Sequence, residues 1–263
     1  MSRGFFVLAS MLLASAPSLA QSQSGKNPNM GESYRVEVQL RRWRSDLISE
    51  LRLSGGGIPG TTLEPFEDLG LENERIFDYH FAARIVRRVK LRGSWMKVKY
   101  QGETAAESAL CVAGLCIPAG GGVSTTLELE ETRGGAEVDL LQGDYGFLAI
   151  AGEYGRFEAR PTFESGSAST GEPLRLDFPL FGMKGRAYLT PALALSVEGM
   201  GWKRENEGVW TDFDASATYS AGRNLGFSYG YRNSYLRFKS IEAAGDRAVV
   251  RVRGQYFAVT VRF

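Results

Sequence analysis

The chain has 263 residues, of which 43% are hydrophobic and 23% charged, with two cysteines and one histidine. This composition excludes wholesale disorder, a disulfide-rich scaffold and any site that needs two histidines. The mean hydropathy of −0.19 is too low for a helical membrane protein. Basic residues (31) and acidic residues (30) nearly balance, which argues against a nucleic-acid-binding protein.

Residues 1–20 have the pattern of a cleaved secretory signal peptide. Arg3 precedes a short apolar segment, and the small residues Ser18 and Ala20 lie at the −3 and −1 positions of a cleavage site. A membrane anchor is the alternative, but the apolar segment is too short for one. We therefore expect an exported protein.

Export sets the expected domain organisation. Residues 21–32 are polar and predict a flexible N-terminal segment, and residues 33–263 predict a single domain. Arg3 is the only charge among residues 1–20, so its removal would balance the basic and acidic residues.

Apolar and polar residues alternate along most of residues 33–263. The clearest run is Tyr34–Leu40, in which every second residue is apolar, and further runs lie at 125–130, 156–163, 211–219 and 225–231. This period of two predicts strands with two different faces. Beyond residue 20 there is no apolar stretch of the ~18 residues that a spanning helix needs.

The alternating runs predict an all-β fold, a single antiparallel up-and-down transmembrane barrel of about ten strands, with eight or twelve possible. Short connections alternate with longer ones, as in outer-membrane barrels, where tight turns lie at one end and loops at the other. The expected strands are 33–54, 74–87, 89–102, 121–142, 145–164, 173–189, 191–204, 208–220, 223–242 and 247–263. The first is either one strand with a bulge near 44–46 or a hairpin, and an even strand count favours one strand.

The last ten residues carry the most specific signal. Phe257, Val259, Val261 and Phe263 alternate with more polar residues. This ending closely resembles the C-terminal strand of bacterial outer-membrane β-barrel proteins. In that family the terminal Phe and the alternating apolar residues are the signal for the barrel-assembly machinery, so the resemblance implies this role for these four residues. It also implies outer-membrane localisation, with outer-membrane lipids and lipopolysaccharide as partners.

A weaker resemblance covers most of the domain. The segments at 57–61, 67–74, 179–191 and 225–232 look like elements of uncharacterised outer-membrane barrel proteins. They imply a shared fold and say little about activity. We expect a monomer with no nucleic-acid partner, no cofactor and no metal.

If the apolar faces meet lipid, the polar faces line the lumen. Charges excluded from lipid must pair across that lumen, and a barrel of about ten strands is narrow. We expect a salt-bridged plug, with a small conduit or ligand cavity as the alternative. The expected lumen cluster is Asp78, His80, Arg84, Arg156, Glu158, Arg160, Asp212, Asp214 and Arg232.

The only histidine, His80, is the one possible general base. Outer-membrane lipid A deacylases use a Ser/His/acid arrangement, and omptin proteases of about this size use a histidine with several acids, but no local motif of either family is present. An enzyme that uses His80 is therefore the alternative, and a structural or narrow-pore barrel with no catalytic residue is the main hypothesis.

Four smaller features complete the expectations. Cys111 and Cys116 enclose four residues, and in an exported protein they predict a small surface disulfide loop. Five acidic residues in the first long loop, residues 55–74, could bind divalent cations, although simple solvation is favoured. Arg251 and Arg253 could meet lipid phosphates. The tryptophans are expected in an aromatic girdle at the strand ends: Trp43, Trp95, Trp202 and Trp210.

Overall fold

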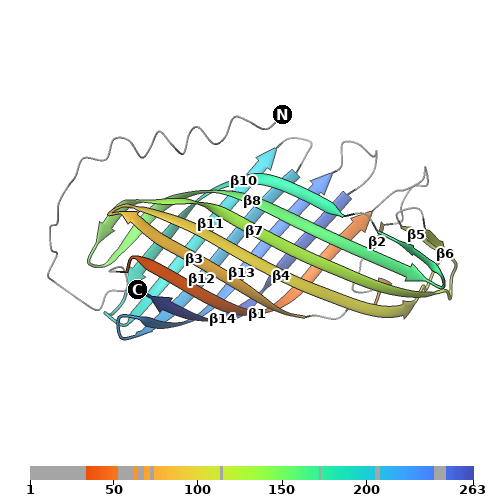
Figure 1. The fold of residues 1–263 in the computed structure, drawn as a ribbon, viewed down its shortest axis with the longest axis horizontal. Coiled ribbons are helices and arrows are strands. Elements are labelled where there is room, and N and C mark those ends of the chain that lie inside the picture. Colours follow the sequence, from red (N-terminus) through yellow and green to blue (C-terminus); the bar gives the residue numbers. More distant parts are fainter. Residues whose placement is uncertain are drawn as a thin grey trace.

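The computed structural model describes residues 34–52, 62–63, 68–71, 74–112, 115–171, 173–204, 208–239 and 247–263. Within these residues, ten long antiparallel strands close into a cylinder (Figure 1). They are β1 (Val36–Arg52), β3 (Arg75–Val86), β4 (Val89–Ala105), β7 (Gly122–Gly143), β8 (Gly146–Ser165), β10 (Leu174–Tyr188), β11 (Leu193–Arg204), β12 (Gly208–Ala221), β13 (Leu225–Lys239) and β14 (Arg247–Arg262). The all-β barrel of ten strands is confirmed. The signal peptide and the flexible N-terminal segment lie outside the described residues.

The ten long strands follow one another around the ring in sequence order, and the ring closes between the last strand and the first. β14 pairs with β1, and β8 pairs with β10, past the short strand β9 (Ala168–Thr170). Closure removes the free edges that an open sheet would expose to lipid. Among the described residues, no helix is long and apolar enough to cross a membrane.

The two ends of the cylinder differ. The C-terminus lies at one end, whereas β2 (Thr62–Leu63), β5 (Leu110–Val112) and β6 (Leu115–Ile117) gather at the other (Figure 1). We call these the turn end and the loop end. The hairpin turn after β7 and the turn after β12 lie at the turn end, so the tight turns and the elaborated connections are segregated as the sequence predicts.

The first predicted span is one strand. β1 pairs with β14 in unbroken register from Glu37 to Arg52, so there is neither a hairpin nor a bulge at 44–46. Register shifts in the described ladders lie instead at Arg84/Val86 and Asp139/Leu141.

The chemical character of the inward and outward faces of the barrel reverses along its length. On β8, Leu148 and Ile150 face outward near the turn end, while Phe157 and Phe163 face inward near the loop end. The strand keeps its alternation throughout; only the chemistry of the two faces changes. The outward apolar residues form a belt that includes Val38, Leu40, Phe77, Tyr79, Phe81, Leu91, Val138, Ile150, Tyr154, Phe181, Met183, Leu195, Val197, Phe213, Phe227, Tyr229, Phe257 and Val261.

Beyond this belt, towards the loop end, lies an outer extension that comprises residues 42–52, 75, 97–105, 122–131, 156–165, 174–177, 233–239 and 247–255. Its outward side chains are largely charged and its inward ones largely apolar. This inverted polarity is what water outside and a packed core inside require. The belt, in contrast, has an apolar outside and a charged inside, as lipid requires.

Candidate functional site in the lumen

A buried arginine occupies the centre of the lumen. Arg232 on β13 donates from Nη2 to Asp212 Oδ2 at 2.7 Å and from Nε to Asp212 Oδ1 at 3.0 Å. Its Nη1 donates to Asp78 Oδ2 at 2.8 Å, and its Nη2 also reaches Glu131 Oε1 at 3.2 Å. The guanidinium fork thus joins carboxylates from β12, β3 and β7.

Arg133 on β7 completes this central network. Its Nη1 lies 2.6 Å from Asp212 Oδ2, and its Nε contacts Glu131. Two arginines therefore face three carboxylates, and Asp78 Oδ2 also accepts a hydrogen bond from His80 Nε2 at 2.8 Å. Buried charges are tolerated only when paired in this way, so the lumen is held closed at this level by ionic contacts between strands across the ring.

A second ionic network lies nearer the turn end. Arg92 on β4 contacts Glu198 on β11 and Glu153 on β8, the latter at 2.5 Å, and it donates to Glu137 Oε2 on β7 at 3.2 Å. Lys90 donates to Glu137 Oε1 at 2.8 Å. The contacts of Arg92 with Glu198 and Glu153 bridge non-adjacent strands, so a second layer of charge pairs crosses the lumen.

A polar cavity of about 60 Å³ lies among these side chains. A water molecule needs roughly 10–15 Å³ of such space, so the cavity holds only a few waters. Its lining is polar and includes Gln39, Arg41, His80, Ser94, Lys184 and Glu198. It is too small for a sugar, a peptide or an acyl chain.

An apolar layer fills the lumen on the loop side of the central network. Trp43 and Trp210 are each 1% exposed, and the Trp210 ring lies 3.7 Å from that of Phe178 and 5.8 Å from that of Phe157. Further members of this layer are Leu47, Ile76, Met96, Val98, Leu129, Leu180, Met200, Leu236, Val250 and Val252. The remaining space there is about 10 Å³.

The ionic and apolar layers are in direct contact. The Arg232 guanidinium lies 5.2 Å from the Trp43 ring centre, and the Arg133 guanidinium lies 5.1 Å from that of Trp210. Cations over indole faces are favourable at this distance. The central arginines therefore close the lumen with carboxylates on one side and aromatic rings on the other.

The structure separates the nine residues of the expected lumen cluster into two groups. Asp78, His80, Arg84, Asp212, Asp214 and Arg232 do face the lumen, where Arg41 pairs with Asp214 at 2.8 Å and Arg84 lies 3.5 Å from Asp139. Arg156, Glu158 and Arg160 lie instead on the outer wall of β8, as do Glu128 and Glu130 on that of β7.

The error has a physical reason. The alternation predicts that the residues between these charges, such as Phe157 and Leu129, face lipid, but in the outer extension the apolar face forms the core. Arg156 pairs outside the barrel with Asp177 at 2.8 Å, and Arg160 pairs with Glu158 at 2.8 Å.

Several lumen residues were missed in the sequence. They are Lys90, Arg92, Glu131, Arg133, Glu137, Asp139 and Glu153. The inward direction of Lys90 and Arg92 could have been inferred from the sequence, because they alternate with the outward Leu91 and Gly93.

The tryptophan girdle is wrong for three of its four members. Trp43 and Trp210 are in the core, and Trp202 packs against that core. Only Trp95 fits the expectation: it is 42% exposed on the outer wall, its ring centre lies 5.5 Å from that of the tilted Tyr79 ring, and it donates to Glu130 at 3.1 Å.

His80 lies in the closed lumen. It faces inward on β3, opposite Ser94 on β4, and both line the small polar cavity. A histidine, an aspartate and a serine are therefore near one another, but the space beside them is too small for a lipid or peptide substrate. The arrangement fits a polar contact of the lumen.

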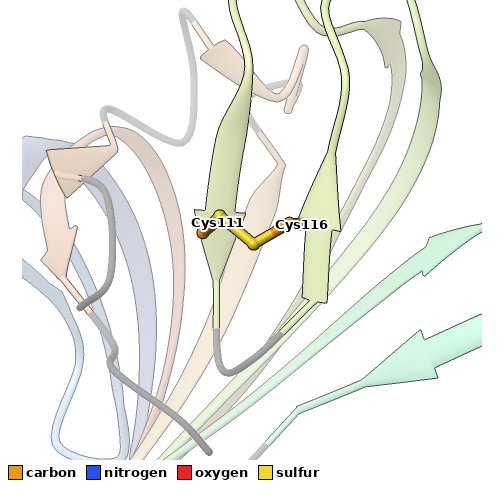
Figure 2. Close-up of a disulfide and its surroundings, with 2 residues drawn as sticks. All are labelled: Cys111 and Cys116. Atoms are coloured by element: carbon orange, nitrogen blue, oxygen red, sulfur yellow. A yellow bond between two sulfur atoms is a disulfide. The ribbon is translucent and has the colours of Figure 1, made fainter. Parts of the chain in front are cut away.

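Features outside the lumen also match their sequence patterns. Phe257, Val261 and Phe263 are exposed on the outer wall, and Val259 shares that face, while the residues between them are buried. Cys111 on β5 and Cys116 on β6 form a disulfide with an S–S length of 2.03 Å (Figure 2). Most of the acidic first loop lies outside the described residues, among which no cluster of three potential metal ligands occurs.

Comparison with known proteins supports the fold. No protein-family model matches the chain, and no curated protein matches it in sequence. Among solved structures, the outer membrane protease OmpT from Escherichia coli aligns over 94% of this chain and 100% of its own, with 10% identity and a TM-score of 0.61. Ail of Yersinia pestis (9% identity, 86% of this chain, 99% of its own) and Neisserial surface protein A (10%, 87% and 97%) each give a TM-score of 0.34.

The fold is therefore that of a bacterial outer-membrane β-barrel. Identity of 10% carries the architecture alone, and the activity of the neighbour does not transfer with it.

Proposed function

We propose that the chain is a closed, non-conducting barrel of the bacterial outer membrane, which holds a rigid outer extension above the lipid. The observation that carries this proposal is the double obstruction of the lumen. The network around Arg232 and the layer around Trp43 and Trp210 lie in series. An ion would have to break buried ion pairs and then cross a dry aromatic layer.

The outer extension supports the same proposal. It has its own apolar core and is tied at the loop end by a second cluster of buried residues, Leu69, Ala106, Ile117, Val123 and Phe163. A wall that projects beyond the belt presents binding surfaces to the medium without any passage through the lumen.

Planar-bilayer recording of the purified full-length barrel tests the proposal. We expect no conductance from the wild-type protein. The single-layer variants Arg232→Ser and Trp43→Gly/Trp210→Gly are also expected to remain closed, since each leaves the other layer in place. Combining the three substitutions with Arg92→Ser, which also removes the second ionic network, should open a conducting path. Heat-modifiable gel migration reports whether each variant is folded.

The second candidate function is a narrow pore. The observation that favours it is the polar cavity of about 60 Å³ on the turn side of the lumen. Stepwise currents from the wild-type protein would support the pore and contradict the closed barrel. Recovery in the outer-membrane fraction is the expected localisation, and a soluble periplasmic product would contradict both candidates.

A further inference from the structure

Charges on the outer extension are distributed unevenly around the barrel. On β8 and β10 the outward arginines are paired with carboxylates of the same wall: Arg156 with Asp177 at 2.8 Å, and Arg175 with Glu158 at 2.7 Å. Arg160 also pairs with Glu158. This side of the wall is therefore close to electrically neutral.

The opposite side of the ring is different. Four strands, β13, β14, β1 and β3, carry an arginine face that consists of Arg42, Arg44, Arg75, Arg237, Arg251 and Arg253. None of the six forms an ion pair with another described residue; Arg251 donates only to the neutral Asn233, at 3.0 Å. The outward carboxylates on these strands beyond the belt are Asp46 and Glu50, so positive charge is in excess.

The strand register brings two of these arginines directly together. Arg44 on β1 lies directly opposite Arg75 on β3, and Arg253 on β14 lies between Asp46 on β1 and Asn233 on β13. Like charges directly opposite on neighbouring strands destabilise a sheet. A counter-charge from outside the chain would remove this cost.

The arginine face borders the apolar belt. Arg42 comes two residues after the outward Leu40 and is paired in register with Phe257, which is 51% exposed. The exposed Ile48 lies opposite Arg251 on β14, next to Tyr235 on β13. Arg42 therefore lies at the edge of the belt, and the other five arginines lie beyond it in the outer extension, with exposed apolar and aromatic side chains among them.

We propose that the arginine face binds the phosphate groups of an anionic glycolipid of the outer leaflet, of the lipopolysaccharide class. Arginine binds phosphate through paired N–H donors, and each basic residue near an anionic lipid surface contributes about fivefold to binding. The inference rests on the outer-membrane location proposed above, and it does not depend on whether the lumen conducts.

The test titrates purified full-length barrel in detergent micelles with rough lipopolysaccharide. Parallel titrations use the same lipopolysaccharide after enzymatic dephosphorylation, and inorganic phosphate alone. Binding is followed by native mass spectrometry. We expect wild-type protein to bind the phosphorylated glycolipid at least about tenfold more tightly than the dephosphorylated one, and to show no saturable binding of inorganic phosphate.

A matched pair of variants locates the site. Arg44→Gln/Arg251→Gln/Arg253→Gln should weaken binding about a hundredfold, whereas Arg156→Gln/Arg160→Gln/Arg175→Gln, on the paired side, should leave it unchanged. Equal weakening in both variants, equal affinity for dephosphorylated lipid, or saturable binding of inorganic phosphate with equal affinity would each overturn the proposal. The wild-type comparison stands even if one variant fails to fold. Barrel recovered outside the outer membrane would count against the proposed location, independently of these titrations.

Discussion

Arg232 on β13 and Asp212 on β12 form a two-bond ion pair in the centre of the lumen, with distances of 2.7 Å and 3.0 Å. The two residues lie on neighbouring strands, but the arginine also reaches Asp78 on β3 and Glu131 on β7. One guanidinium thereby joins four strands of the barrel.

The first prediction concerns this arginine. Arg232→Met removes the charge while keeping a side chain of similar length, and it leaves three carboxylates without their main partner. Loss of one member of a buried ionic network costs about 3–5 kcal/mol. Urea unfolding of the barrel in lipid vesicles measures the change.

The control is Arg156→Met, whose ion pair with Asp177 lies on the exposed outer wall. It should leave the unfolding midpoint unchanged. Equal effects of the two substitutions would mean that Arg232 does not organise the lumen.

The second prediction separates lipid-facing from core tryptophans. Brominated lipids quench only indoles at the lipid boundary, so Trp95→Phe should remove most of the quenching seen with the wild-type protein. Trp210→Phe should leave that quenching intact, because Trp210 is 1% exposed. The opposite pattern would restore the aromatic girdle that the sequence suggested for Trp210.

The third prediction concerns a close approach between strands. Phe178 on β10 lies across Gly155 on β8, and a Cβ at Gly155 would come within 2.5 Å of the Phe178 ring. Because Phe178 is itself packed against Trp210, it has little room to move. Gly155→Ala should destabilise the barrel by about 1–3 kcal/mol in urea unfolding.

Gly134→Ala provides the matched control, since a Cβ there meets nothing within 4 Å. Its unfolding midpoint should equal that of the wild-type protein. A neutral Gly155→Ala would show that the Phe178 ring is not confined by the core.

The fourth prediction concerns the disulfide at the loop end. The bond closes a hairpin with a sequence separation of 5 (Figure 2), and it joins none of the ten long strands. Cys111→Ser/Cys116→Ser should therefore leave heat-modifiable migration unchanged and increase proteolysis only within the 110–117 hairpin. Intact-mass analysis before and after reduction checks the bond in the wild-type protein. A barrel that loses its heat-modifiable form in this variant would contradict a local role.

The fifth prediction addresses assembly. Phe263 is 68% exposed on the outer wall, so its removal should cost little packing. If it acts as the assembly signal, Phe263→Ala should lower the amount of barrel in the outer membrane severalfold while refolding in detergent stays unchanged. Phe227→Ala, another outward aromatic residue, is the control. Equal losses in both variants would assign the effect to lipid contact.

Most of the fold was predictable because it depends on the alternation of apolar and polar residues along each strand. Each of the ten strands predicted from period two appears within a few residues of its expected bounds, and the even count correctly favoured β1 as one strand. Because tight turns connect consecutive strands, each strand could pair with few partners other than its neighbours in sequence. The outward face of Phe257, Val261 and Phe263 followed from the same pattern.

The site was predictable only in part. Asp78, Asp212 and Arg232 alternate with outward apolar residues inside the belt, so their inward direction could be inferred. Arg156 and Glu158 follow the same alternation, but they lie beyond the belt, where the apolar side is the inside. Nothing in a strand of constant alternation marks the residue at which lipid gives way to water.

The sequence by itself determined the strand spans, their antiparallel order and the presence of two faces on every strand, because these depend on period two and on turn residues. Only the tertiary structure decided which face is inside at each height, and which charges meet. The reason is that Arg232, Asp78 and Glu131 are distant in sequence and become neighbours only when the sheet closes. The same closure assembles the arginine face, since β14 joins β1 from opposite ends of the chain.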